Sequence, residues 1–201
     1  MLTPRTKKSW KPLVRSVVSL AVLMLPMFTV VVAPSKATPI KASPVVNNIQ
    51  AIKVDLPTRL EIPAINVTAP IVYEGLTSEG AMDIKKDPTE VAWYKLGPRP
   101  GEKGSAVIAG HYGFSANGEG SVFNGLHTLN KGDKISVIDN NNTTTNFVVR
   151  ESRRYSPKAD ATDVFISNDG KSHLNLITCD GIWENDQNTY SNRLVVFADK
   201  E

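Results

Sequence analysis

Three residues whose side chains catalyse acyl transfer in other proteins lie at the ends of apolar runs. Cys179, the single cysteine of the chain, follows the run 173–178 and is followed by Asp180-Gly181. His111 follows the run 106–110, and Arg193 opens the run 194–198. Because one cysteine cannot form an intrachain disulfide, any chemistry at Cys179 is that of a nucleophile.

A thiol, an imidazole and a guanidinium together suit thiol-based acyl transfer. An ordinary thiol is mostly protonated at neutral pH, and a neighbouring imidazole can take its proton and later protonate a leaving amine. The tetrahedral intermediate carries an oxyanion, which a permanently charged guanidinium stabilises without exchanging a proton.

Each of these residues also has an ordinary structural interpretation. A lone cysteine after an apolar run is often a small buried core residue, and an arginine at a strand edge often only prevents aggregation. His127 and His173 are alternatives to His111 as the base. Arg153 and Arg154 are alternatives to Arg193.

The N-terminal segment predicts export across a membrane. Residues 1–15 hold five Lys or Arg and no acid, and residues 16–33 are 18 residues without a charge, although Pro26 would kink a helix there. The basic flank predicts that the rest of the chain lies outside. Two interpretations remain, an uncleaved anchor or a signal peptide cut after Ala37, and the length of the basic region favours the anchor.

The N-terminal segment and the rest of the chain differ in net charge. Residues after 37 hold 17 of the 23 Lys and Arg but all 20 Asp and Glu, so their net charge is −3 although the whole chain is +3. This balance excludes a nucleic-acid surface, and one cysteine excludes a disulfide scaffold. We expect an N-terminal anchor or signal peptide at 1–37, a proline-containing linker at 38–55 and one domain at 56–201.

The domain pattern predicts mostly β-structure. Strand-like runs lie at 60–62, 69–73, 106–109, 134–138, 146–150, 173–179 and 193–198. Residues 134–150 read as a hairpin, and helical turns are expected within 121–129 and 160–167. Short strands with many Gly and Pro indicate a sandwich or barrel. Residues 180–192 are expected to form a loop that folds away from the cysteine, with Trp183 and Tyr190 as walls of a substrate groove.

Several segments resemble the sortases. Ala109-Gly110-His111, Leu176-Ile177-Thr178-Cys179 and residues 192–198 are similar, in order, to the histidine, cysteine and arginine motifs of that family. Residues 60–67 resemble its first strand and turn, and residues 123–133 resemble the stretch after its histidine. The resemblance covers roughly residues 58–199. It implies a closed eight-stranded β-barrel with short helices, here preceded by a hydrophobic N-terminal helix.

The resemblance also implies a function. A sortase-like cysteine transpeptidase cuts a C-terminal sorting signal, typically of the Leu-Pro-x-Thr-Gly kind, and passes the acyl group to an amine of the cell wall or of another protein. Cys179 is then the nucleophile, His111 the acid and base, and Arg193 the stabiliser of the oxyanion. Thr178, Trp183 and Tyr190 would contact substrate.

Partners and cofactors follow from the same resemblance. We expect sorting-signal peptides, an amine acceptor such as a peptidoglycan precursor, and a single-pass attachment to the cell membrane with the domain outside. No cofactor is expected. Some sortases bind calcium, but Asp160, Asp163 and Asp169 are too few and too scattered for the oxygen ligands that calcium requires.

Two other classes remain open at this point. A papain-like cell-wall cysteine peptidase also pairs cysteine with histidine, but it usually places the cysteine first, at the start of a helix. A non-catalytic β-domain that binds wall proteins would keep its function in a Cys179→Ala variant. The sortase subclass, the sorting motif and the acceptor are not predicted.

Overall fold

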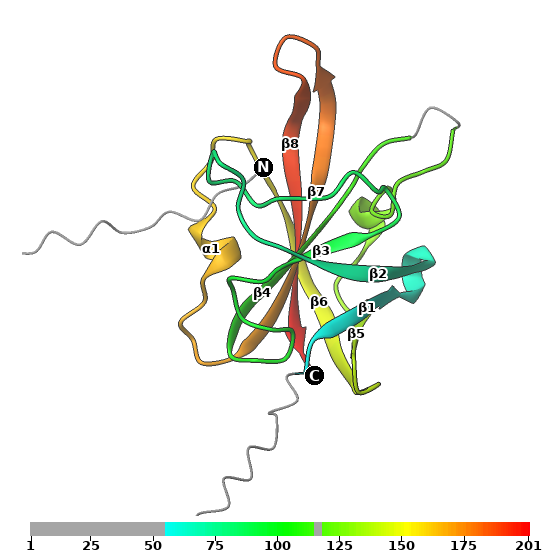
Figure 1. Ribbon diagram of the computed structural model, residues 1–201, viewed down its shortest axis with the longest axis vertical. Coiled ribbons are helices and arrows are strands. Elements are labelled where there is room, and N and C mark those ends of the chain that lie inside the picture. The colour runs from blue at the N-terminus through cyan, green and yellow to red at the C-terminus, as the bar shows by residue number, and fades with distance from the viewer. Residues whose placement is uncertain (1–54, 115–117) are drawn as a thin grey trace, which may run out of the picture. The chain divides into compact units, whose positions relative to one another are not determined.

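Eight strands close into one barrel in this computed structural model, which describes residues 55–114 and 118–201. Their order is β1-β2-β3-β4-β7-β8-β6-β5, and β1 pairs with β5 to complete the ring (Figure 1). The strands are β1 Pro57–Ile62, β2 Val67–Glu74, β3 Val91–Tyr94, β4 Gly104–Gly110, β5 Lys134–Asp139, β6 Thr144–Tyr155, β7 Ser172–Glu184 and β8 Thr189–Lys200. The short helices are η1 Pro63–Ile65, η2 Leu126–Thr128 and α1 Thr162–Phe165. The predicted mainly β, closed eight-stranded barrel with short helices is confirmed.

Two of the strand pairs are parallel. β2 pairs with β3, and β4 pairs with β7, in parallel register, while the other pairs are antiparallel. Parallel strands need a long connection, and β4 and β7 are joined through β5, β6 and α1. The predicted hairpin at 134–150 is present as β5 and β6, with Asn142 in the left-handed region at φ 61° in its turn.

Alternation along β4, β7 and β8 separates two apolar clusters. Even-numbered residues such as Ile108, Leu176 and Leu194 point into the barrel, and odd-numbered ones such as Ile177 and Val195 join a second cluster outside it. This is the two-residue period of a strand. Both faces of these strands are buried, which explains why the sequence shows continuous apolar runs there.

The outer cluster is covered by two connecting segments. Val164 and Phe165 of α1 pack onto it, as does Met82 from the segment between β2 and β3. The ring of Phe165 meets Tyr94 edge-on, with centroids 5.4 Å apart. These contacts fix the segments that border the outer face of β4, β7 and β8.

The structure corrects the sequence predictions at three places. Strand β3 was not predicted, because its four residues are all buried and show no alternation. Cys179 lies inside β7 and does not end it. Residues 180–192 are not a loop, because β7 and β8 continue together as a hairpin that projects beyond the other strands (Figure 1).

The predicted hydrophobic helix at 16–33 and the predicted boundary after residue 37 lie outside the described residues. Within residues 55–114 and 118–201, the helices are all too short to cross a membrane.

Candidate active site

Cys179 and Arg193 are direct cross-strand partners in the antiparallel pair of β7 and β8. Opposed residues in such a pair project to the same face, with Cβ atoms roughly 4.5–5.5 Å apart. Their odd numbers place both on the outer face, in line with Ile177 and Val195. The strand pairing alone therefore places Cys179 and Arg193 side by side on one face of the sheet.

His111 is brought to the same face by the parallel pairing of β4 with β7. Ala109 pairs with Ile177, so continuing the register sets His111 beside Cys179. The Thr178 hydroxyl donates a 2.8 Å hydrogen bond to the Gly110 carbonyl, which fixes this end of β4 against β7. The cysteine and the arginine thus lie in the adjacent strands β7 and β8, and the histidine directly follows β4, the neighbour of β7.

The hydrogen bonding of His111 determines which ring nitrogen is available. Its Nε2 lies 2.6 Å from the carbonyl oxygen of Lys85, which can only accept a hydrogen bond. Nε2 therefore carries the proton, and in the neutral ring Nδ1 has the lone pair that can accept one. Gaining a second proton at Nδ1 would leave the contact with Lys85 intact.

Arg193 is almost completely buried, with 5% of its surface exposed. Its Nη1 donates to the carbonyl oxygens of Tyr190, at 2.9 Å, and Asn192, at 2.8 Å. Its Nη2 donates to the Thr189 hydroxyl oxygen at 2.8 Å. A buried guanidinium is stable only when its donors are satisfied, and here the hairpin satisfies three of them.

One cavity of about 390 Å³ is shared by His111, Cys179 and Arg193. Its floor consists of Gly110 and His111 at the end of β4 and residues 177–179 in the middle of β7, and its wall is the segment between β2 and β3. The remaining lining residues are Thr77, Glu79, Ala81, Met82, Asp83, Ile84, Gly110, Ile177 and Thr178. The cavity combines an apolar wall with a thiol, an imidazole and a guanidinium, which suits an extended peptide.

The wall residues 77–84 were missed by the sequence analysis. The segment has neither strand nor helix periodicity, and its shape depends on backbone hydrogen bonds from Thr77 to Ala81 and from Asp83 to Gly75. Met82, which is 1% exposed, ties it to the outer cluster. The one available signal was the pair Met82 and Ile84 in an otherwise polar stretch.

The three residues expected to contact substrate lie in different places. Thr178 lines the cavity, but its hydroxyl is bonded to Gly110. Trp183 and Tyr190 are not among the described residues that line the cavity. They lie opposite each other on the projecting hairpin, with ring centroids 5.1 Å apart, so any contact with substrate would occur beyond the cavity.

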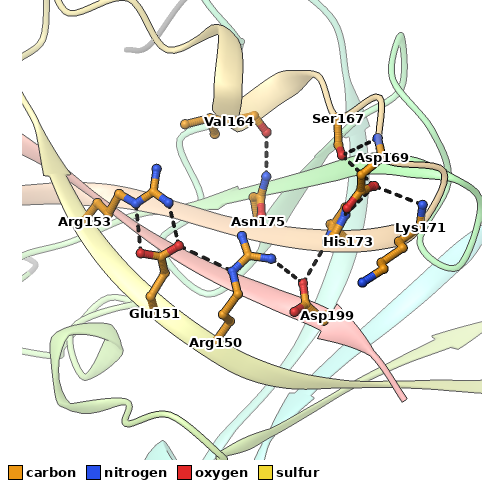
Figure 2. A network of polar contacts seen from close by, with 10 residues as sticks. All are labelled: Arg150, Glu151, Arg153, Val164, Ser167, Asp169, Lys171, His173, Asn175 and Asp199. Atoms are coloured by element: carbon orange, nitrogen blue, oxygen red, sulfur yellow. Dashed lines mark hydrogen bonds and ion pairs between the residues drawn. The ribbon is translucent and has the colours of Figure 1, made fainter.

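The alternative bases are engaged elsewhere. The Nδ1 atom of His127 lies 3.0 Å from the Asn124 carbonyl in the turn of η2. His173 is six residues before Cys179 on β7, roughly 20 Å away along a strand. Its ring lies between the carboxylates of Asp169 and Asp199, as Figure 2 shows.

The alternative arginines also have other partners. Arg153 binds Glu151 and Asp163 and lies over the ring of Phe197. Arg154 pairs with Asp180, while most of its side chain is exposed. Neither is among the described residues that line the cavity.

The three acids considered for calcium make local contacts. Asp160 accepts hydrogen bonds from Thr162, and Asp163 binds Arg153 and Tyr155. Asp169 contacts Ser167, Lys171 and His173. In the part of the chain that the structure describes, no three His, Cys, Asp or Glu side chains are grouped so as to hold a metal ion.

Comparison with solved structures finds the same fold. Sortase C-1 of Actinomyces oris is 26% identical, with a TM-score of 0.57 over 72% of this chain and 73% of that one. Sortase C2 of pilus island 1 of Group B Streptococcus is 25% identical, with a TM-score of 0.54 and the same coverage. A lid mutant of sortase A from Corynebacterium diphtheriae, 22% identical, matches at 0.57 over 77% of this chain and 74% of that one. The matches therefore include sortases of two kinds.

The family itself is established from the sequence. No curated protein is similar enough to count as a match. The model of the sortase domain, however, matches residues 60–201. This range is nearly the whole barrel and contains His111, Cys179 and Arg193. A papain-like peptidase is excluded, because Cys179 lies within a strand of this barrel and not at the start of a helix. The chain therefore belongs to the sortase family of cysteine transpeptidases.

Proposed function

We propose that Cys179, His111 and Arg193 are the catalytic residues of this transpeptidase and that it acts on sorting signals of the Leu-Pro-x-Thr-Gly kind. The supporting observation is that these three side chains, from β7, β8 and the residue directly after β4, line one cavity. The apolar part of the wall, which includes Met82 and Ile84, suits the apolar residues at the start of such a signal.

The first half of the reaction forms a thioester. His111 Nδ1 takes the thiol proton, and the Cys179 sulfur bonds to the carbonyl carbon of the scissile peptide bond. The resulting oxyanion is stabilised by Arg193. When the intermediate collapses, the C–N bond breaks and His111 returns the proton to the leaving amine.

The second half transfers the acyl group to an amine. The acceptor nitrogen attacks the thioester carbon and gives a proton to His111, and Arg193 again stabilises the oxyanion. The C–S bond then breaks, an amide forms and the proton returns to Cys179. Water in place of the amine would give hydrolysis. The acceptor we propose is an amine of the cell wall, such as that of a peptidoglycan precursor, or of another protein.

No cofactor takes part in this sequence, since every proton and electron pair is supplied by Cys179, His111 and the two substrates. We also propose that residues 16–33 hold the protein at the membrane with the barrel outside, because a charge-free run follows five basic residues. Fractionation combined with protease treatment of protoplasts tests this. A soluble form that begins at Thr38 would show signal cleavage instead.

The activity is tested with the full chain in detergent, a library of pentapeptide signals and several amine acceptors, with products identified by mass spectrometry. We expect new amides at the threonine of Leu-Pro-x-Thr-Gly peptides and a thioester adduct on Cys179. Cys179→Ala is the matched control and is expected to form no product. Product formation by that variant would remove the assignment, as would a wild-type chain that merely binds the peptides.

A further inference from the structure

The guanidinium of Arg193 is held by residues of its own hairpin. Two of its three bonds run to backbone carbonyls, those of Tyr190 and Asn192, and both engage Nη1. The third runs from Nη2 to the Thr189 hydroxyl. Thr189 is thus the one described side chain that holds this guanidinium, and it alone contacts Nη2.

Part of the Arg193 guanidinium remains free to bind a reacting oxyanion. A guanidinium has five N–H groups, two on each Nη and one on Nε. Both donors of Nη1 and one of Nη2 are used within the hairpin. The N–H of Nε and one N–H of Nη2 remain, and the Nε N–H lies on the edge of the planar group that Nε shares with Nη2. A carboxylate-like or oxyanion ligand would bind along that edge.

The projecting part of the hairpin fixes the position of Thr189. Thr189 begins β8 and pairs with Glu184, the last residue of β7. Between them Gln187 donates to the Glu184 carbonyl, and Asn188 adopts a left-handed conformation with φ 49°. The tight turn and the three residue pairs beyond the pair of Cys179 with Arg193 therefore set the Thr189 hydroxyl against Nη2.

We propose that Thr189 is a positioning residue for Arg193, which aims the Nε and Nη2 edge of the guanidinium at the oxyanion. The proposal rests on the catalytic role given to Arg193 above. Electrostatic stabilisation depends on donors that are already oriented before charge develops. Without the hydroxyl, Nη2 loses its only partner among the described residues, and the guanidinium can turn about its bonds to the two carbonyls.

The test compares Thr189→Val, which keeps the shape but removes the acceptor, with Thr189→Ser, which keeps the acceptor. We expect kcat for peptide cleavage to fall by about 10-fold in Thr189→Val, as for the loss of one hydrogen bond to a charged group, with little change in KM. Thr189→Ser is expected to restore most of the loss. Equal loss in both variants would overturn the proposal.

Two further measurements separate positioning from general damage. Alkylation of Cys179 by iodoacetamide needs no oxyanion, so its rate is expected to be the same in Thr189→Val and the unchanged protein. In an Arg193→Ala background, Thr189→Val is expected to cause no further loss, because the two residues act through one group. An additive loss in that background would overturn the proposal.

A structural measurement decides the contact without activity. Crystal structures of the full chain and of Thr189→Val are expected to differ in the orientation of the Nε and Nη2 edge of Arg193. An unchanged guanidinium in Thr189→Val would contradict the positioning role. A chain that cleaves no sorting signal would refute the proposed function, and these crystal structures would still decide whether Thr189 orients Arg193.

Discussion

Tyr112 and Tyr190 meet edge-on, with ring centroids 5.4 Å apart and planes at 83°. Tyr112 directly follows His111, and the carbonyl of Tyr190 accepts a hydrogen bond from Arg193. The loop after the histidine is therefore in contact with the hairpin that holds the arginine. Movement of either segment would therefore displace both His111 and Arg193.

Gly113→Ala is expected to disturb this contact. A Cβ at Gly113 would lie 2.8 Å from the Tyr190 hydroxyl, so the Tyr190 ring must shift, and its contact with Tyr112 with it. We expect turnover to fall by about 10- to 100-fold, since a small displacement of a catalytic group is costly.

Gly132→Ala is the matched control for that variant. Gly132 has φ 100°, close to the 105° of Gly113, but nothing lies within 4 Å of its added Cβ. Both variants carry the same backbone strain, about 1–3 kcal/mol, and are expected to lose similar thermal stability. Equal loss of turnover in the two variants would show that strain alone is responsible.

Arg193→Ala is expected to lower turnover by about 10²–10³, the range seen when one oxyanion donor is removed. Arg193→Lys would recover only part of it, because an ammonium lacks the planar fork. Arg153→Ala and Arg154→Ala test the alternative arginines. Because neither arginine lines the cavity among the described residues, and the pair of Arg153 with Glu151 is exposed and worth about 0–1 kcal/mol, we expect turnover near that of the unchanged protein. A large loss in either, with full activity in Arg193→Ala, would reassign the role.

Thr178→Val is expected to destabilise the pairing of β4 with β7. The substitution removes the buried hydrogen bond to the Gly110 carbonyl, and we expect the free energy of unfolding to fall by about 1–2 kcal/mol. Thr178→Ser, which keeps the hydroxyl, serves as the control. Urea denaturation measures both. If Thr178→Val were as stable as the unchanged protein, the hydroxyl would be available for substrate, as first expected.

Asp169→Asn is expected to change how stability depends on pH. The backbone N–H of Lys171, then His173 and Ser167, hold the pKa of Asp169 well below its usual range (Figure 2). The folded state therefore binds fewer protons than the unfolded state, so this stabilisation is complete above about pH 4 and is lost as the pH falls further.

Thermal unfolding across this range measures the effect. We expect Asp169→Asn to melt at a lower temperature than the unchanged protein at neutral pH, with the difference shrinking below about pH 4. Asp186→Asn is the control, because its carboxylate makes no hydrogen bond with the described residues. A difference that stayed constant with pH would mean that the charge of Asp169 contributes nothing.

The parts of the fold that follow strand periodicity could be predicted from the sequence. The runs before Cys179 and after Arg193 are strands because alternate residues face two apolar clusters. Cys179 and Arg193 both line the cavity. The continuation of β7 and β8 as a hairpin beyond Cys179 and Arg193 could not be predicted from the sequence. Gly181, at φ 87°, lies where the register of β7 and β8 shifts between Asp180 and Trp183, and a Gly after Asp looks like a turn.

The cavity wall and the hydrogen bonds that hold Arg193 could not be predicted from the sequence either. The wall at 77–84 depends on long-range packing of Met82, and the guanidinium is held mainly by backbone carbonyls. Every residue has a backbone carbonyl, so the residue types do not indicate which carbonyls will bind a side chain.

The parallel pairing of β4 with β7 has a consequence for how the enzyme matures. The hydrogen bond between Thr178 and Gly110 joins positions 68 residues apart, so Cys179 comes to lie beside His111 only after the four intervening elements, η2, β5, β6 and α1, have formed. Sheets built from such distant pairs form slowly, in milliseconds to seconds. Until the barrel closes, Cys179 is an unassisted thiol, and we expect peptide cleavage to appear together with closure when the unfolded chain is diluted from denaturant. We therefore expect a chain whose barrel has not yet closed to have no transpeptidase activity.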